Sequence, residues 1–229
     1  MRPKIAALAL FATLACSGTG EQPREQVQNA PPAAAPQRDQ RRVILFLGTS
    51  LTAGFGVGIE HAFPTIIQQK IDRAKLPFRV ENAGLSGETS AGGWRRLDWS
   101  LQQPVDVLVL ELGANDGLRG LSVAQMRANL DSILTRTTTR YPDARLLIAG
   151  MEAPPNLGSQ YTTSFHQTFS DLAREHHAVL IPFLLNGVAG SPELNQDDGI
   201  HPNVRGHRIV ADTVWKYLQP ALRQRVGGS

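Results

Sequence analysis

The chain has 229 residues, of which 41% are hydrophobic and 19% charged, with 21 glycines, 15 prolines and one cysteine. This composition is typical of a globular protein and excludes a wholly disordered chain, a collagen and a coiled coil, while the single cysteine excludes an intramolecular disulfide and a cysteine-based zinc cluster. The formal net charge of +3 comes from scattered residues with no basic block, which gives no reason to expect nucleic acid as a partner.

The first predicted element is an export signal. Arg2 and Lys4 precede an apolar run over residues 5–15, which is too short to span a bilayer and has the length of a secretory h-region. We therefore predict a signal peptide over residues 1–15 and an exported protein.

A candidate lipid-attachment site follows this signal directly. Residues 14–17 (LACS) resemble the end of a bacterial lipoprotein signal, in which cleavage leaves the cysteine at the mature amino terminus to carry lipid. Thr13 and Leu14 stand where an aliphatic and a small residue are more usual. We expect Cys16 to be lipidated and to hold the protein on the periplasmic face of a bacterial membrane. A soluble periplasmic form, a retained anchor and a misread start are the alternatives.

A tether is predicted after the cysteine. Residues 18–40 consist mainly of glutamine, proline, alanine and glycine, with Val27 as the single large aliphatic residue. Such a stretch buries too little apolar surface to offset the conformational entropy that it would lose on folding. We therefore predict the lipid-attachment cysteine and a disordered linker over residues 16–40, a folded domain over 41–222 and a tail over 223–229.

Short aliphatic runs alternate with longer segments of helical period in the predicted domain. The predicted strands lie at residues 43–47, 78–81, 105–110, 146–149 and 179–183. The predicted helices lie at residues 62–75, 89–102, 122–140, 160–177 and 203–218. Pro202 suits the first turn of the last helix, and Asn203 suits its cap. This alternation predicts a three-layer α/β/α sandwich with a five-stranded parallel sheet, as in flavodoxin-like folds.

Polar residues suited to acyl transfer follow the predicted strands. Ser50 follows the first strand, Asn115 follows the third, and Asp198 and His201 lie in the loop after the fifth. Ligands bind at the carboxyl ends of parallel strands, so we expect these side chains to lie close together. Asp198 and His201 are three residues apart, which allows the carboxylate to accept a bond from one imidazole nitrogen while the other faces Ser50.

Each of these residues also has a purely structural interpretation. Ser50 suits a helix N-cap, while Asp198 and Asn115 both belong to sequences that favour turns. Together they supply a nucleophile, a base and an orienting acid, and Asp197 is the chief rival of Asp198 for the orienting role.

Acyl transfer also needs hydrogen-bond donors for the developing oxyanion. The candidates are the backbone N–H groups of Ser50 and Gly84 and the side-chain amide of Asn115. Gly84 is also compatible with an ordinary turn glycine. Asn115 is more informative, because an amide directly after a buried apolar strand is unusual for packing alone.

Four sequence blocks resemble those of the SGNH (GDSL) hydrolases. They are residues 47–54 (LGTSLTAG), 82–84 (NAG) with 86–89 (SGET), 113–117 (GANDG) and 198–203 (DGIHPN). Within that superfamily the chain most resembles the group of bacterial arylesterases, acyl-CoA thioesterase I and lysophospholipase L1. The block named for Gly-Asp-Ser-Leu has Thr49 where aspartate is usual, and we expect this to alter the hydrogen bonds of the nucleophile turn without abolishing activity.

The resemblance implies a serine esterase. The family roles fall on Ser50 as nucleophile, His201 as base and Asp198 as its orienting acid, with Ser50, Gly84 and Asn115 as oxyanion donors. The implied reaction is hydrolysis of aryl or alkyl carboxylic esters through an acyl-enzyme, extending to thioesters or lysophospholipids. It uses a small ester or lipid substrate and needs no cofactor, metal or protein partner.

An apolar groove for the acyl group is expected at the strand ends. Leu118, Leu157 and Tyr161 are the candidates to line it, although such residues serve equally well as loop anchors. An acetyl-esterase acting on cell-envelope polysaccharide and a non-catalytic lipoprotein that binds lipid or glycan are the alternative functions.

Overall fold

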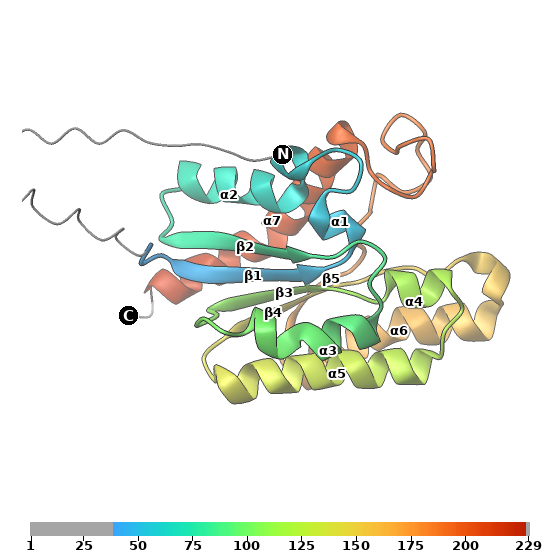
Figure 1. The fold of residues 1–229 in the computed structure, drawn as a ribbon, viewed down its shortest axis with the longest axis horizontal. Coiled ribbons are helices and arrows are strands. Elements are labelled where there is room, and N and C mark those ends of the chain that lie inside the picture. Colours follow the sequence, from blue (N-terminus) through green and yellow to red (C-terminus); the bar gives the residue numbers. More distant parts are fainter. Residues whose placement is uncertain (1–38, 228–229) are drawn as a thin grey trace, which may run out of the picture. The chain divides into compact units, whose positions relative to one another are not determined.

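A five-stranded sheet in which every strand is parallel forms the centre of the protein (Figure 1). The computed structural model describes residues 39–227. The predicted signal peptide, Cys16 and nearly all of the predicted linker lie outside the described residues. From Gln40 onward the chain forms one compact unit.

The strands follow the order β2-β1-β3-β4-β5 across the sheet. Their bounds are β1 Arg42–Gly48, β2 Phe78–Gly84, β3 Val107–Glu111, β4 Arg145–Ala149 and β5 Val179–Ile181. β3 is buried along its whole length, as is β1 after its first residue, because helices cover both faces of the sheet. The predicted three-layer sandwich is confirmed. β5 is shorter than predicted, since Pro182 has no N–H with which to continue the ladder.

The helices form the two outer layers (Figure 1). α2 and α7 lie on one face of the sheet, and α3, α5 and α6 lie on the other. The helix bounds are α1 Ser50–Ala53, α2 Phe63–Arg73, α3 Ser90–Ser100, α4 Ala114–Leu118, α5 Val123–Arg140, α6 Ser159–Glu175 and α7 Val204–Gly227, with 3-10 turns at Ile59–His61 and Pro155–Leu157. The five long helices begin within one residue of the predicted positions. α1 and α4 were not predicted, because one turn of helix has no measurable period.

The start of α7 bears on the loop that holds the predicted acid and base. Asn203 caps the helix, since its Oδ1 accepts hydrogen bonds from the N–H groups of Arg205 and Gly206 at 3.0 and 3.1 Å. The placement of Pro202 in the first helical turn is wrong. Pro202 precedes the cap and forms an isolated antiparallel bridge with Asn195, which closes the base of the loop.

The end of α7 corrects the predicted domain boundary. The helix continues through Pro220 to Gly227, so a tail beginning at residue 223 is wrong. Leu222 is fully buried, and Arg225 forms an ion pair with Asp106 at 3.4 Å, so contacts with the sheet hold this last segment in place. Neither α7 nor any other helix within residues 39–227 is long and apolar enough to cross a membrane.

The sheet changes its direction of winding at β1, which pairs with β2 on one side and β3 on the other. Such a switch point creates a crevice outside the carboxyl ends of the strands, where ligands bind in open α/β sheets. Gly48, the last residue of β1, lies in register with Gly84 of β2 and Glu111 of β3. The segments that follow these three residues therefore lie around one crevice.

Candidate active site

Ser50, His201 and Asp198 form a continuous chain of hydrogen bonds at this crevice. The Ser50 Oγ lies 2.8 Å from the His201 Nε2, and the His201 Nδ1 lies 2.6 Å from the Asp198 Oδ2. An ionised carboxylate only accepts hydrogen bonds, so the imidazole proton resides on Nδ1 and Nε2 accepts the Ser50 hydroxyl. This geometry allows the imidazole to remove the hydroxyl proton.

The loop that carries the acid and the base is held in shape by Asp198 itself. Its Oδ1 accepts the backbone N–H groups of Ile200 and His201, each at 2.9 Å. Gly199 between them has φ +69°, a backbone conformation that glycine adopts without strain. The three-residue spacing thus closes a local turn that brings the carboxylate to the imidazole. Asp197, the rival acid, makes no hydrogen bond with His201.

Hydrogen bonding also sets the charge of Asp198. The backbone N–H of His201, followed by the imidazole and the N–H of Ile200, lowers the pKa of this carboxyl from 3.8 to about 2. Asp198 is therefore ionised at every pH at which the domain is expected to work, and it favours the imidazolium that forms when His201 takes a proton.

Gln196 connects this loop to the segment that follows the nucleophile. Its backbone N–H donates to the His201 carbonyl at 2.8 Å, and its Nε2 donates to the carbonyls of Phe55 at 2.8 Å and Pro202 at 3.0 Å. The Phe55 ring also lies against the imidazole of His201, with ring centroids 4.8 Å apart. These contacts tie two segments that are distant in the sequence, so that the imidazole stays opposite Ser50.

Two of the three predicted oxyanion donors lie beside the nucleophile. Ser50 begins α1, so its backbone N–H has no partner within the helix and is free to bind an anion. Asn115 lines the same cavity as Ser50 and His201. One hydrogen of its amide goes to the Glu88 carbonyl at 2.9 Å, which orients the amide and leaves the second hydrogen for a ligand.

Gly84 does not fit the third predicted role. Its N–H donates to Asn82 Oδ1 at 2.9 Å, and a Cβ on it would lie 2.3 Å from the backbone nitrogen of Ala53. Gly84 therefore packs against α1, and its N–H already has an acceptor. The prediction is wrong for this residue, because the Asn82 side chain already accepts the hydrogen bond from the Gly84 N–H and leaves no donor for an oxyanion.

Gly87 is a candidate oxyanion donor that sequence reasoning missed. It lies in the loop between β2 and α3 with φ +77°, and no described residue accepts a hydrogen bond from its N–H. Its carbonyl accepts a hydrogen bond from Arg119, and the next carbonyl along the chain, that of Glu88, holds the Asn115 amide. In the sequence, Gly87 could have been considered because residues 86–89 (SGET) belong to the same block as Gly84.

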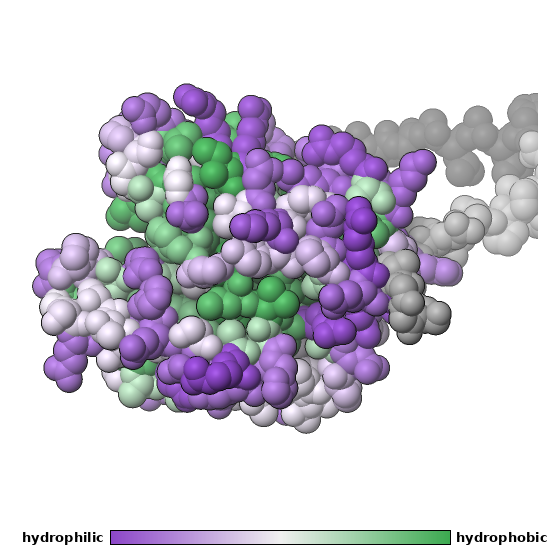
Figure 2. Space-filling model, turned by 180° about the vertical axis from the view of Figure 1, so that it is seen from behind, coloured by the Kyte–Doolittle hydropathy of each residue, from purple (hydrophilic) through white to green (hydrophobic). Residues whose placement is uncertain are grey.

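The triad opens onto a cavity of about 440 Å³. Figure 2 shows hydrophobic residues in an indentation at the left of the view, on the side of the molecule to which the strands point. The apolar residues that line the cavity are Leu51, Ala114, Leu118, Met151, Ala153, Pro154, Pro155, Phe183, Leu185, Ala189 and Ile200. Glu152 is the one acidic side chain in the lining, and it lies 2.7 Å from the Nδ1 of His166.

Of the three residues predicted to bind the acyl group, Leu118 lines this cavity. Leu157 and Tyr161 do not, and instead line a separate depression. The Tyr161 hydroxyl donates to the Leu121 carbonyl at 2.7 Å, and its ring stacks on Phe165. For these two residues the prediction is wrong, because Tyr161 anchors the loop before α5 and Leu157 lies beside Gly120 in the separate depression.

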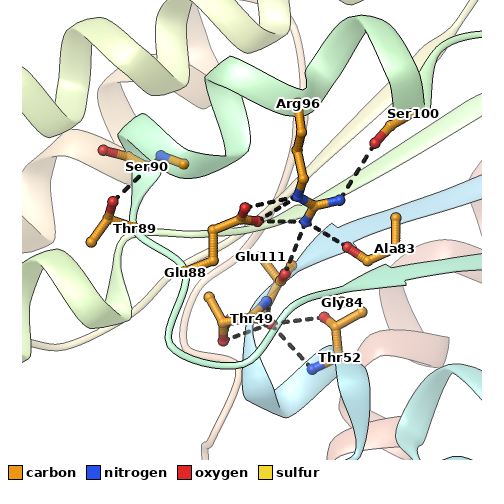
Figure 3. Close-up of polar contacts among 12 residues, drawn as sticks. Thr49, Thr52, Ala83, Gly84, Glu88, Thr89, Ser90, Arg96, Ser100 and Glu111 are labelled. Carbon is orange, nitrogen blue, oxygen red and sulfur yellow. Dashed lines mark hydrogen bonds and ion pairs between the residues drawn. The ribbon is translucent and has the colours of Figure 1, made fainter.

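A buried polar network beneath the nucleophile turn was not predicted (Figure 3). Glu111 is fully buried and accepts hydrogen bonds from Thr49 and Thr52. Arg96 forms an ion pair with Glu88 and donates to the carbonyls of Ala83 at 2.7 Å and Gly48 at 3.4 Å. The sequence signal for Glu111 was a charged residue at the end of an otherwise apolar strand.

The described residues contain no cluster of three or more histidine, cysteine or acidic side chains arranged to hold a metal ion.

Comparison with known proteins identifies the family. Residues 46–209 match the model of the GDSL-like lipase/acylhydrolase family. The chain belongs to this family. The GDSL match includes Ser50, Asn115, Asp198 and His201, and the resemblance inferred from the four sequence blocks is confirmed.

Several GDSL relatives are similar over most of their length. Esterase TesA of Pseudomonas aeruginosa is 35% identical over 187 residues, which are 81% of this chain and 92% of the relative. Thioesterase 1/protease 1/lysophospholipase L1 of Escherichia coli is 38% identical over 181 residues, which are 78% and 84% of the two chains. These names support a carboxylic-ester hydrolase, and the present chain is a GDSL enzyme of this class.

Solved GDSL structures agree with the fold. A crystal structure of TesA superposes with a TM-score of 0.74 at 34% identity, over 78% of this chain and 99% of the other. The psychrotrophic esterase EstA from Pseudoalteromonas sp., inhibited by monoethylphosphonate, gives a TM-score of 0.75 at 33% identity, over 80% and 99% of the two chains.

Proposed function

We propose that this protein is an exported serine esterase that hydrolyses carboxylic esters with Ser50, His201 and Asp198. The observation that carries the proposal is the continuous chain of hydrogen bonds from Ser50 Oγ through His201 to Asp198, at 2.8 and 2.6 Å, on the wall of an apolar cavity. A serine hydroxyl is a weak nucleophile by itself and needs an adjacent base such as this one.

The reaction proceeds in two steps. His201 Nε2 takes the proton of Ser50 as Oγ attacks the acyl carbonyl, and the imidazolium then protonates the departing alcohol, leaving an acyl-enzyme. A water molecule enters, gives its proton to His201 and attacks the acyl carbon, and the acid leaves as Ser50 recovers its proton. Asp198 stays ionised throughout and keeps the proton of the resting imidazole on Nδ1.

The oxyanion of each tetrahedral intermediate is stabilised by the Ser50 N–H, the free hydrogen of the Asn115 amide and the Gly87 N–H, which takes the place first assigned to Gly84. What supports this set is that each of the three hydrogens is without an acceptor among the described residues and belongs to a segment that borders the crevice. Removal of one such donor costs about 2.7–4 kcal/mol in the barrier of acyl-transfer enzymes.

The substrate class follows from the cavity. Its lining is mainly aliphatic and proline side chains, which favours an acyl chain over a hydrated sugar. Each buried methylene contributes about 0.8 kcal/mol, so kcat/KM is expected to rise about fourfold per added carbon until the cavity is full. We expect short to medium acyl esters, with thioesters and lysophospholipids as further substrates.

Export and lipid attachment belong to the same proposal. The signal over residues 1–15 and Cys16 lie outside the described residues, and the proposal for them rests on the sequence pattern. Labelling cells with a fatty-acid analogue tests it. Label on the wild type that disappears in Cys16→Ala is expected, and an unlabelled wild type or a labelled Cys16→Ala variant would refute lipidation.

A fluorophosphonate probe and a chain-length series of aryl esters test the activity. The probe is expected to label the wild type once and to leave Ser50→Ala unlabelled, with no ester turnover by that variant. An unlabelled wild type would favour the non-catalytic binding lipoprotein. Release of acetate from acetylated polysaccharide, without turnover of longer acyl esters or lysophospholipid, would favour the acetyl-esterase.

A further inference from the structure

Glu111 lies beneath the turn that carries Ser50. It is the last residue of β3 and is directly opposite Gly48, the last residue of β1, in the strand register. Its side chain is fully buried and points to the segment between β1 and α1 (Figure 3). A Cβ on Gly48 would lie 2.6 Å from Glu111 Oε2, so glycine at this position leaves room for the carboxylate.

The carboxylate accepts hydrogen bonds from both sides of the nucleophile. Its Oε2 accepts the Thr49 N–H at 2.8 Å, the Thr52 hydroxyl at 2.7 Å and the Thr52 N–H at 3.3 Å. Its Oε1 accepts the Thr49 hydroxyl at 2.9 Å. Two backbone and two side-chain donors thus converge on one group, and they come from the residue before Ser50 and the residue two positions after it.

A buried carboxyl group at this position costs stability if its only role is to fill space. Burial raises the pKa of Glu111 because no water solvates its charge, and the bonds from Thr49 and Thr52 only partly oppose this effect. No described arginine, lysine or histidine lies within ion-pair distance of it; the nearby Arg96 pairs with Glu88. An apolar residue of similar size would be expected to fill the space with less loss of stability.

We propose that Glu111 is a positioning residue for Ser50. By holding Thr49 and Thr52, it fixes the first turn of α1 and with it the direction of the Ser50 hydroxyl and N–H, without itself touching the substrate. This inference rests on the proposed function, since it concerns the same nucleophile.

The side-chain hydroxyl of Thr49 gives this chain one of the four bonds. Aspartate is usual at this position in the family block, and an ionised aspartate has no proton to donate to a second carboxylate. The Thr49 hydroxyl donates to Glu111 and so adds a side-chain bond to the one made by the backbone. The threonine at this position therefore connects the nucleophile turn to β3 through its side chain as well as its backbone.

The test compares Glu111→Gln with Asp106→Asn. Asp106 precedes β3 at its other end, and its carboxylate accepts the Val43 N–H of β1 at 3.2 Å, so it is a matched loss of a carboxylate away from Ser50. In Glu111→Gln, an amide N–H₂ faces groups that are themselves donors. Misplacement of a reacting group by about 1 Å costs about 100-fold. We expect kcat and the rate of fluorophosphonate labelling to fall by about that factor, with little change in KM, whereas Asp106→Asn keeps the wild-type kcat.

A second pair of variants tests the same inference if Glu111→Gln does not fold. Thr49→Ser keeps the hydroxyl and is expected to retain wild-type kcat, and Thr49→Val loses it and is expected to lose kcat with an unchanged KM. Equal activity of the two Thr49 variants, or of Glu111→Gln and wild type, overturns the role of Glu111, as does an equal loss of kcat in Asp106→Asn. A wild type without esterase activity, or an active Ser50→Ala, refutes the proposed function instead.

Discussion

The His201 Nδ1 lies 2.6 Å from Asp198 Oδ2, while the other oxygen of the same carboxylate accepts the backbone N–H groups of Ile200 and His201. The acid therefore orients the imidazole ring and shapes the loop that carries it. Both functions depend on an ionised carboxylate. Substitution of Asp198 and the pH dependence of kcat/KM are two tests of this dependence.

Asp198→Asn is expected to lower kcat by about 10⁴-fold while the fold is retained. An amide presents N–H to Nδ1 and favours the tautomer in which the Ser50 hydroxyl faces a protonated nitrogen. Steady-state kinetics on an activated aryl ester measures the loss. Asp197→Asn is the matched control and should retain wild-type kcat; a larger loss in Asp197→Asn than in Asp198→Asn would reverse the assignment.

Asp198 is expected to make no contribution to the pH profile of kcat/KM above pH 4. Hydrogen bonds hold the pKa of Asp198 at about 2, so its carboxylate keeps its charge between pH 4 and pH 8. The logarithmic plot of kcat/KM against pH should therefore fall no more steeply than a slope of one in this range. A slope of two above pH 4 would show that the carboxylate titrates there. The stability that Asp198 contributes is present above its unfolded pKa and should be lost only as the pH falls towards 2.

Glu152→Gln is expected to change which acyl groups the cavity accepts. Glu152 lines the cavity beside His166, and its negative charge disfavours an acyl chain that ends in a carboxylate. For a partly exposed charge the effect is about 1 kcal/mol, or about fivefold in kcat/KM for the anionic ester at low salt. Neutral esters of the same length should be unaffected. Glu175→Gln, which removes an exposed charge from the pair with Arg127, is the control, and equal effects of both variants would exclude a local role for Glu152.

His207 is expected to make the domain less stable as the solution is acidified. The side chain is buried against Phe63, and its Nδ1 accepts the Phe63 N–H at 3.3 Å. Burial, followed by the nearby charges of His201 and His61, lowers its pKa from 6.5 to about 4.

The unfolded chain therefore binds a proton below pH 6.5, which the folded chain does not bind until about pH 4. Stability should fall in this window, by about 2 kcal/mol at pH 5 relative to neutral pH. Denaturant unfolding at pH 7 and pH 5 measures it. His207→Asn should show a smaller difference between the two pH values, while the exposed His177→Asn should keep the wild-type difference.

Arg96→Met is expected to destabilise the domain by about 3–5 kcal/mol. The Glu88 side chain is 4% exposed and would be left without its ion-pair partner. The double variant Glu88→Gln with Arg96→Met should recover part of the loss, because no unpaired charge stays buried. Arg136→Met breaks an exposed pair with Asp98 and should cost less than about 1 kcal/mol in the same denaturant titration. Equal losses in both arginine variants would contradict the importance of burial.

Much of the scaffold was predictable because its signals act over a few residues. The five long helices begin within one residue of the positions that the helical period predicted, and α3, α5 and α7 begin at the polar caps Thr89, Ser122 and Asn203. Asp198 and His201 were recognisable as a pair, since the turn around Gly199 closes between residues that are only three apart. The position of Ser50 after a buried strand placed it at the same edge of the sheet.

Other features depended on side chains from distant segments. In the sequence, Gly84 and Gly87 are equivalent turn glycines, and they differ because the Asn82 side chain accepts the N–H of Gly84 in the folded chain. Leu157 and Tyr161 were predicted to line the acyl groove because they are apolar residues near the strand ends. In the folded chain the Tyr161 ring stacks on Phe165, and both residues line another depression.

The sequence by itself thus determined the fold class, the order of the elements and the residues of the proposed triad, because periodicity, capping and turn closure are local. The tertiary structure decided which donors are free, which apolar side chains line the cavity and which side chain lies beneath the turn that carries Ser50. Glu111 is 62 residues from Thr49, and their hydrogen bond exists only because β1 and β3 pair in one register.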